Sequence, residues 1–291
     1  MSKSIYFIIV LILLAVPISA RERIDAEDIL KSIDTGRLVE YRNVEIVGDL
    51  DLTTLQDRES SNGSDEVRYH VRVPVLFEDC IFNGDVIAYR HESWKNKTHI
   101  VIFHADAIFY GCEFRRDSAF KYSQFHGTAD FNNASFQKEA LFKYVQFLNR
   151  SGFARSRFSD RANFKYAKFS TGISFSYSLF YKEADFKYTN FQETADFASA
   201  EFQDDANFKY TKFHETVDFT AAKFLDDADF KYTKFPRGVS FRNCVFRGDA
   251  NFKYAAFSEP FDSEGLQFHN SVDSKYTKLE GRSLALDSFK K

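Results

Sequence analysis

Residues 184–210 read ADFKYTNFQETADFASAEFQDDANFKY. Phenylalanine stands at positions 186, 191, 197, 202 and 208, so the step between successive Phe alternates between five and six residues. The same alternation runs from Phe103 to Phe257 with no member missing across 29 Phe. The tripeptide Phe-Lys-Tyr returns with a 22-residue period, and this period defines the repeating unit of this part of the chain.

Steps of five and six residues fit neither an α-helix nor a flat strand. At about 100° per residue, a helix would send successive Phe to different sides. In a strand, an odd step reverses the face, so the Phe stay inward only if the chain turns a corner between them. Small residues stand two positions before most of these Phe, as Ala184 does before Phe186, and share their inward side. The pattern therefore predicts short strands joined by tight corners, with four faces in each coil.

The motifs Ala-Asp-Phe-Lys-Tyr (184–188) and Ala-Asn-Phe-Lys-Tyr (206–210) resemble the pentapeptide-repeat family, and the resemblance covers roughly Phe77 to Leu279. The added sixth residue at every second step is similar to a Phe-rich subgroup of that family. The resemblance implies an all-β fold, a right-handed quadrilateral parallel β-helix; the spacing alone does not give its hand. We expect this solenoid of 22-residue coils to occupy residues 44–279.

Residues 1–20 have the composition of a signal peptide. Lys3 is followed by an apolar run from Ile5 to Val16, and cleavage after Ala20 would leave Arg21 first. The apolar run is shorter than the roughly 20 residues that span a bilayer. We therefore expect a secreted or cell-surface protein, with a membrane anchor made by residues 5–18 as the alternative.

Both ends of the solenoid are expected to be covered. Residues 21–43 are assigned to a short N-terminal capping helix, because Asp25 is a candidate N-cap and Ile29 and Ile33 have helical spacing. Residues 280–291 are assigned to a C-terminal cap or tail. Such covers protect the unpaired edges of the terminal coils. Polar loops near 58–66 and 89–99 are expected to be exposed.

Three cysteines fall in the inward slot two residues before a Phe: Cys80, Cys112 and Cys244. Cys112 and Cys244 are six repeats apart, which places them about 29 Å from each other at the spacing of neighbouring strands. This separation is far beyond the limit of about 7 Å for a disulfide. We interpret the cysteines as buried free thiols.

Two polar columns follow the same 22-residue period. Lysines stand at 121, 143, 165, 187, 209, 231, 253 and 275, and tyrosines stand one residue later, from 122 to 276. Acidic residues of the same period at 117, 139, 183, 205, 227 and 249 are expected to neutralise the lysines, with Arg161 as the exception; a stripe that binds polyanions is the alternative. The tyrosines are expected to lie over the corner with their hydroxyls in water, or to form a platform for sugars or a partner.

The sequence contains no convincing catalytic, cofactor or metal residues. The seven histidines lack metal-ligand spacing, and we expect none to stack on adjacent coils. The formal charge of −3 is too small to attract nucleic acid. We predict a non-enzymatic extracytoplasmic structural or interaction scaffold that binds a protein or surface partner, or its own copies. The alternatives are a DNA-mimic type inhibitor of a topoisomerase and a glycan-binding or glycan-cleaving β-helix.

Overall fold

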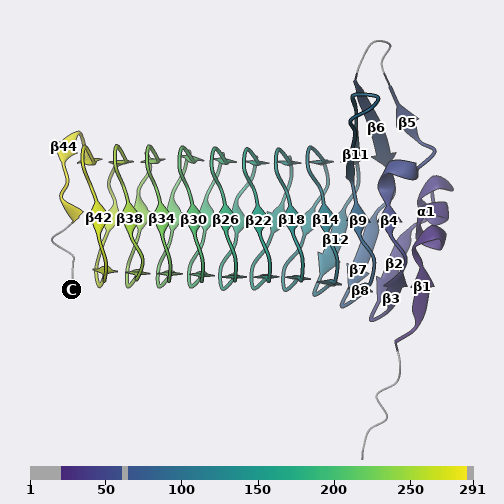
Figure 1. The fold of residues 1–291 in the computed structure, drawn as a ribbon, viewed down its shortest axis with the longest axis horizontal. Helices are drawn as coiled ribbons and strands as arrows, with labels where there is room; N and C mark the ends of the chain where they lie inside the picture. The colour runs from purple at the N-terminus through teal and green to yellow at the C-terminus, as the bar shows by residue number, and fades with distance from the viewer. Residues whose placement is uncertain (1–20, 61–64, 287–291) are drawn as a thin grey trace, which may run out of the picture.

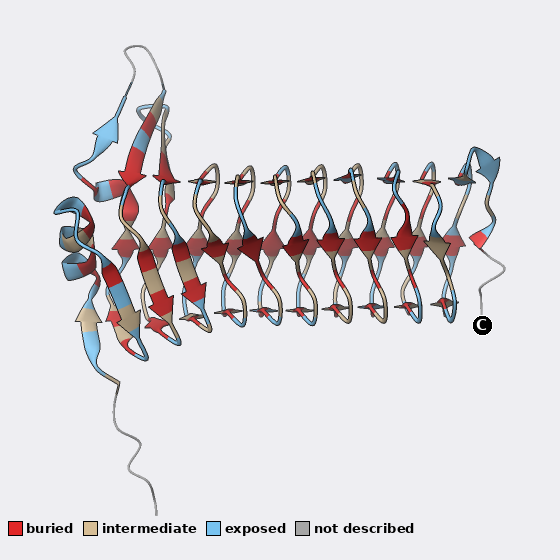
Figure 2. Ribbon diagram, turned by 180° about the vertical axis from the view of Figure 1, so that it is seen from behind, coloured by how far each residue is buried: buried red, intermediate tan, exposed pale blue. Residues whose placement is uncertain are grey.

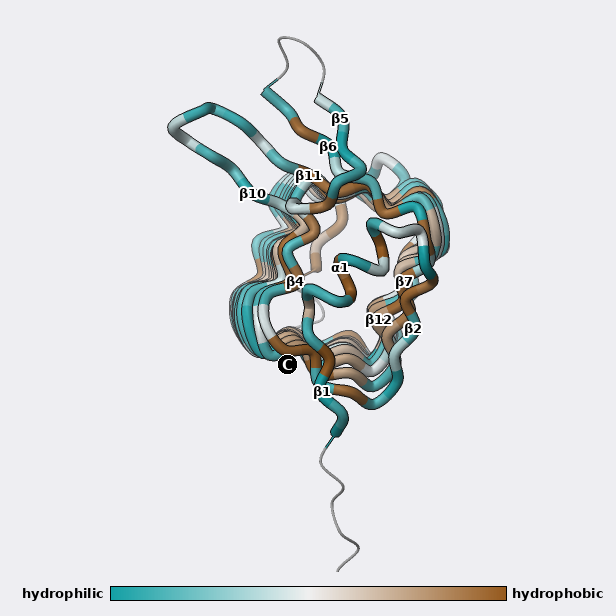
Figure 3. The backbone as a smooth tube through the Cα atoms, turned by 90° about the vertical axis from the view of Figure 1, so that its right-hand side faces the viewer, coloured by the Kyte–Doolittle hydropathy of each residue, from teal (hydrophilic) through white to brown (hydrophobic). Residues whose placement is uncertain are grey.

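The protein is a straight rod of stacked coils, with a helix and two protruding hairpins at its N-terminal end (Figure 1). The computed structural model describes residues 21–60 and 65–286. The expected signal peptide, residues 61–64 of the first expected loop and the last five residues lie outside the described part. Viewed along the rod, each coil is a closed outline with four sides, and helix α1 lies across the open end of the first coil (Figure 3).

Four sheets form the sides of the rod, and their strands recur with the 22-residue period of the sequence. In the regular part, sheet A runs from β13 (Glu113–Phe114) to β41 (Gln267–Phe268), sheet B from β16 (Ala129–Asp130) to β40 (Phe261–Asp262), sheet C from β14 (Ser118–Ala119) to β42 (Val272–Asp273), and sheet D from β15 (Gln124–Phe125) to β43 (Lys278–Leu279). The chain passes through the sheets in the order D, B, A, C, and every pairing between these coils is parallel. The predicted all-β parallel solenoid is confirmed.

The first coils carry longer and additional strands. Sheet A begins with β1 (Arg23–Asp25), β3 (Glu45–Val47) and β8 (Ile81–Phe82); sheet B with β2 (Val39–Arg42), β7 (Val75–Glu78) and β12 (Ala107–Tyr110); sheet C with β4 (Leu50–Asp51) and β9 (Val86–Ile87); sheet D with β5 (Arg58–Glu59), β6 (Glu66–Val71), β10 (Tyr89–Glu92) and β11 (Lys97–Phe103). A short 3-10 helix, η1 (Leu52–Thr54), follows β4.

Phenylalanine fills the interior, as the step pattern predicts. Phe164 is fully buried and stacks on Phe142 and Phe186 of the neighbouring coils, with both centroid distances 5.1 Å. Within the stack it meets Phe153 and Phe175 edge to face, at 5.1 and 5.2 Å. Both arrangements are favourable for aromatic rings. Figure 2 shows the result as buried strands that recur at regular intervals along the rod.

Helix α1 (Ala26–Asp34) covers the N-terminal end of this core. The side chain of Asp25 accepts a hydrogen bond from the backbone N–H of Glu27 at 2.9 Å, which makes Asp25 the N-cap. Ile29 and Ile33 are buried against the first coil. The helix is shorter than the segment 21–43 assigned to it, because β1 and β2 flank it and already pair within sheets A and B.

The two expected loops are largely hairpins. Strands β5 and β6 pair antiparallel, as do β10 and β11, and both hairpins project from the side of sheet D (Figure 3). Strands β6 and β11 also pair with each other in parallel, from Glu66 opposite Thr98 to Val71 opposite Phe103. The inserted segments therefore extend sheet D outward instead of forming irregular loops.

At the C-terminal end, β44 (Arg282–Ser283) folds back antiparallel on β43 and covers the last edge of sheet D. Leu286 is buried and Leu284 is partly buried against the core. Residues 287–291 of the segment assigned to the C-terminal cap or tail lie outside the described residues.

Candidate functional site

The Lys–Tyr column is the most regular feature of the surface. We use this name for Lys121 and Tyr122 together with the seven Lys-Tyr pairs that follow with the 22-residue period, ending at Lys275 and Tyr276. Each pair lies at the corner between sheets C and D, in a β-turn that begins at an inward Phe. In the turn of residues 186–189, the N–H of Thr189 donates to the carbonyl of Phe186 at 3.0 Å.

Every tyrosine of the column has a left-handed backbone. Their φ angles lie between 59° and 64°. A type II turn requires positive φ at this position, which glycine and asparagine adopt most readily. For a bulky residue such as tyrosine this conformation costs on the order of 1 kcal/mol or more. Eight successive turns therefore carry a residue type that the turn itself disfavours.

The opposite corner of the same coils supplies an internal comparison. There, between sheets B and A, the same kind of turn is closed by the N–H of Ser178 donating to the carbonyl of Phe175 at 3.1 Å. Its left-handed position is occupied by mixed residues: Gly111, Asn133, Arg155, Tyr177, Ser199, Ala221, Asn243 and Gly265. The fold thus accepts many residue types at this position, and the uniform tyrosines of the column need another explanation.

The tyrosine rings stack on one another along the rod. Centroids of neighbouring rings are 4.7 to 4.9 Å apart and the ring planes are within 16° of parallel. The four most exposed rings, Tyr166, Tyr232, Tyr254 and Tyr276, are 36% to 55% exposed. Because neighbouring rings cover each other's faces, the column presents ring edges and hydroxyls to solvent. A platform that stacks sugars on open ring faces is therefore available only at the column's ends.

Each lysine of the column lies over the tyrosine that follows it. The Nζ atoms are 5.0 to 5.7 Å from the ring centroids. The ammonium groups therefore form a row that follows the spacing of the coils.

The expected neutralisation of these lysines by direct ion pairs is not found. Within residues 21–60 and 65–286, no column lysine forms an ion pair with a carboxylate. The acidic row lies across sheet C, at the corner between sheets A and C, where Glu183 pairs instead with Arg161 at 3.0 Å. Burial, followed by the neighbouring Lys121 and Lys165, lowers the pKa of Lys143. The row of ammonium groups therefore repels itself without a paired counter-charge.

Sheet D continues this surface on the other side of the column. The first residue of each two-residue strand faces outward, while the following residue is inward. These outward residues are Gln124, Gln146, Lys168, Asn190, Lys212, Lys234, Ala256 and Lys278. None of the eight is acidic, so the basic character of the column extends over sheet D.

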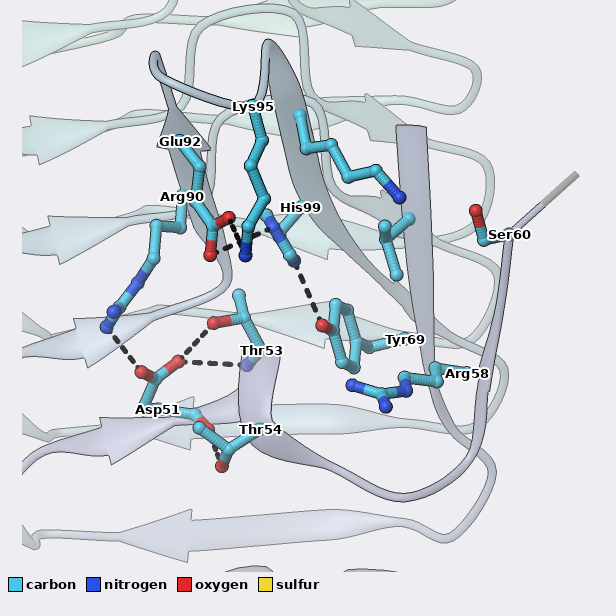
Figure 4. Close-up of a pocket in the computed structure, with 12 residues that line it drawn as sticks. Asp51, Thr53, Thr54, Arg58, Ser60, Tyr69, Arg90, Glu92, Lys95 and His99 are labelled. Carbon is cyan, nitrogen blue, oxygen red and sulfur yellow. Dashed lines mark hydrogen bonds and ion pairs between the residues drawn. The ribbon is translucent and has the colours of Figure 1, made fainter. Parts of the chain in front are cut away.

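At its N-terminal end the column leads to a cavity, which we call the head pocket. Tyr89, the first residue of β10, is 5.9 Å from the ring of Tyr122, and its hydroxyl accepts a hydrogen bond from Lys121 Nζ at 2.9 Å. The next residue, Arg90, lines the pocket. This cavity of about 810 Å³ lies among the two hairpins and η1, and neither inserted segment could form it alone (Figure 4).

Most charged groups of the head pocket are paired inside it. Arg90 contacts Asp51 at 2.5 Å, and Lys95 contacts Glu92 at 3.0 Å. Arg58 and Lys97 add two further cations to the lining. The pocket therefore has an excess of positive charge.

A partly buried histidine, His99, lies at the back of the pocket. The hydroxyl of Tyr69 is 2.9 Å from Nδ1 of His99, and Nε2 of His99 is 3.6 Å from Glu92 (Figure 4). Burial lowers the pKa of His99, which favours the neutral ring. Tyr69 is almost fully buried and its hydroxyl is held by His99, so this tyrosine offers no free nucleophile to the pocket. The arrangement is suited to holding the hairpins together.

Acidification is expected to destabilise the two hairpins around the head pocket. Because the pKa of His99 is lowered in the folded state, the unfolded chain binds a proton there more readily. The stability contributed by the neutral ring is complete above the ordinary His pKa of about 6.5 and is lost as the pH falls through the lowered value. The protection of the β10 and β11 amides against hydrogen exchange, corrected for the intrinsic pH dependence of exchange, should therefore fall on acidification more in wild type than in His99→Gln. Equal pH dependence in the two proteins would contradict this role.

The expectation that no histidines stack on adjacent coils was wrong. His104 and His126 occupy equivalent positions of successive 22-residue repeats, and their ring centroids are 5.4 Å from each other. Nδ1 of His70 is 2.9 Å from Nε2 of His104, across the β6–β11 pairing. Burial, and then the charge of Arg72, lowers the pKa of His104. A hydrogen bond between two rings needs at least one of them neutral, and the lowered pKa agrees with that.

The cysteines are buried free thiols, as predicted. Cys80 and Cys112 are a nearer pair than Cys112 and Cys244, because they occupy equivalent positions before β8 and β13, which are adjacent in sheet A. Hydrogen bonding with Cys112 lowers the pKa of Cys80 to about 7, while burial raises that of Cys112. Both thiols are inaccessible to solvent.

Among the described residues, one cluster of three carboxylates is compact enough to hold a cation. Carboxylate oxygens of Asp204, Asp205 and Asp226 lie within 4.8 Å of one another on the surface. Burial and then Asp226 raise the pKa of Asp205, which is the effect of like charges near each other. Exposed acidic rows of this kind are ordinary on a solenoid, and we assign no metal to this one.

Comparison with family models identifies pentapeptide repeats in the regular part of the rod. Residues 101–146, 142–189 and 186–234 each match a family model described as pentapeptide repeats (9 copies). The resemblance inferred from the Ala-Asp-Phe-Lys-Tyr motifs is therefore confirmed over this part. Comparisons with curated proteins and with solved structures gave no match. None of the described helices has the length and apolar character that crossing a membrane requires.

Proposed function

We propose that this protein is a non-enzymatic, extracytoplasmic rod that binds its partner along the Lys–Tyr column. One observation carries the proposal: tyrosine occupies the left-handed position of eight successive turns, whereas the equivalent turns at the opposite corner hold six different residue types. Tyrosine strains the backbone in every coil, and the turn does not require it. We therefore explain the uniform tyrosines by a partner that contacts this surface.

The solenoid suits a scaffold role. Buried side chains form one continuous core along the rod, and the pentapeptide-repeat character of residues 101–234 favours a repeat scaffold over an enzyme. The extracytoplasmic location is supported by the composition of residues 1–20. If these residues are a cleaved signal peptide, mass spectrometry of the secreted protein will give Arg21 as its first residue.

The binding surface can be tested with a photo-crosslinking amino acid at two matched positions. Tyr188 lies in the column, and Tyr177 occupies the same left-handed turn position at the opposite corner, with φ of 61° and 58° respectively. In secreting cells, the Tyr188 variant should form adducts with a partner and the Tyr177 variant should not. Adducts from both positions, or from Tyr177 alone, would contradict the proposal. Adducts between copies of the chain would identify the partner as the protein itself.

A further inference from the structure

The charge pattern of the Lys–Tyr column restricts the chemistry of its partner. The column carries one ammonium group per coil, and the stacked rings beside it set that spacing at 4.7 to 4.9 Å. No described carboxylate pairs directly with these groups. A partner that brought one negative charge per coil would therefore relieve the repulsion along the whole row.

The straightness of the column favours an extended polymer. A duplex of DNA winds its phosphates around an axis, so only a few of them could meet a straight row at once. A single nucleic-acid strand gains much of its binding energy from bases that stack on open aromatic faces. In the column those faces are covered by neighbouring tyrosines, for example Tyr166 by Tyr144 and Tyr188.

The hydroxyl row adds a second requirement. Every coil presents one phenol ring with one ammonium group 5.0 to 5.7 Å from the centre of that ring, so a matching repeat unit would carry one anion together with hydrogen-bonding groups. A chain of linked sugar acids has this composition, with one carboxylate and several hydroxyls on each ring. A pyranose ring in such a chain advances it by a distance close to the spacing of two neighbouring β-strands.

We infer that the partner of the Lys–Tyr column is a linear polyuronate, a polysaccharide with one carboxylate on each sugar, which lies along the rod over the column and sheet D. The inference rests on the proposed function, because it names the partner of the same surface. We place the polymer on the sheet D side, because the outward residues of the two-residue strands from β15 to β43 include Lys168, Lys212 and Lys234 and no acid. The acidic row lies at the far border of sheet C. On sheet C itself, the carboxylates of Asp185, Asp229 and Asp273 accept hydrogen bonds from the backbone N–H groups of Lys187, Lys231 and Lys275, so the sheet C side of the column is partly acidic.

The test measures binding of an oligogalacturonate as long as the column by isothermal titration at several salt concentrations. The column variant replaces Lys143, Lys165, Lys187 and Lys209 by Gln. The control variant replaces Lys138, Arg157, Lys182 and Lys223 by Gln, which removes the same charge from sheet A and its border with sheet C. A third variant replaces the four column lysines by Arg and keeps their charge. Circular dichroism confirms that all four proteins are folded.

The inference predicts salt-dependent binding by wild type, and binding about tenfold or more weaker in the column variant, since each exposed ion pair contributes a factor of about 1.5 to 5. The control and Arg variants should stay within about threefold of wild type on the same estimate. The fully methyl-esterified oligomer, which has no charge, should not bind.

Three results would overturn the inference. The first is no binding of the oligogalacturonate. The second is equal loss in the column and control variants, and the third is equally tight binding of duplex DNA or polyglutamate, which would make the column a general polyanion surface. If the oligomer fails to bind while the Tyr188 crosslinker still captures a partner, the proposed function stands and only the polyuronate assignment falls. If the Tyr188 crosslinker captures nothing as well, both fall.

Discussion

Replacing Phe164 by Ala is expected to lower the free energy of unfolding by about 3 to 5 kcal/mol, the range for removing a buried aromatic ring. Phe164 is fully buried near the middle of the rod and touches rings above, below and beside it. Its neighbours belong to coils whose backbones are fixed by parallel pairing on both sides. The surrounding rings therefore have little freedom to collapse into the space that the substitution leaves.

Chemical denaturation followed by circular dichroism measures this effect, with Leu179→Ala as the control. Leu179 faces outward from β25 (Leu179–Phe180), one residue before an inward Phe, and should cost less than about 1 kcal/mol because little apolar surface is lost there. Phe164→Leu, which fills more of the space, should lie between the two. A cost for Phe164→Ala no larger than that of Leu179→Ala would show that the Phe stack does not hold the rod together.

Replacing Ile29 by Asp is expected to uncover the N-terminal end of the rod. Ile29 is fully buried where α1 meets the first coil, so the substitution removes apolar contact and places a carboxylate in an apolar site. The cost is about 3 kcal/mol or more. Loss of the cap would expose the edges of the first coil, and exposed edges of parallel strands pair with other chains.

Size-exclusion chromatography and denaturation together test the cap. The Ile29→Asp protein should form oligomers at concentrations where wild type is monomeric. Lys31→Asp introduces the same carboxylate on the exposed side of the same helix and should behave like wild type. A stable monomer of the Ile29→Asp protein would mean that α1 is dispensable as a cover.

The regular part of the fold could be predicted from sequence because one short-range rule generates it. An inward Phe at every fifth or sixth position forces a corner between neighbours, and the 22-residue identity of Phe-Lys-Tyr gives the coil. The N-cap at Asp25 could likewise be predicted, since capping depends on adjacent residues. Strands β1 and β2 could not, because they are too short for an alternation to be recognised.

The two hairpins and the head pocket could not be predicted, because the strands that form them do not pair at the 22-residue period of the regular coils. Strands β6 and β11 pair Val71 with Phe103, an offset in sequence that is longer than one regular coil. This offset is not visible in the sequence, so the contact between the two inserted segments around His99 could not be inferred from it. The stacking of His104 on His126, in contrast, follows from their 22-residue separation and was available from the sequence.

The 22-residue period predicted the Lys–Tyr column correctly, but the prediction that acidic residues of the same period neutralise its lysines failed. Glu183 and Lys187 are close in sequence and share the period, yet the two-residue strand β26 (Ala184–Asp185) separates them and places them at different corners of the coil. The shared period shows that two columns run parallel. It does not show that their side chains meet.

Residue-by-residue acetylation of lysine amines tests most directly whether the Lys–Tyr column is the surface by which the rod binds. Reaction rates would be compared between the purified protein and the protein in its native setting, in or around the cells that make it. The account predicts that the column lysines from Lys121 to Lys275 become protected, while Lys138, Lys182 and Lys223 react as fast as before. Protection of the latter three with no change in the column, or identical rates for every lysine in both states, would contradict it.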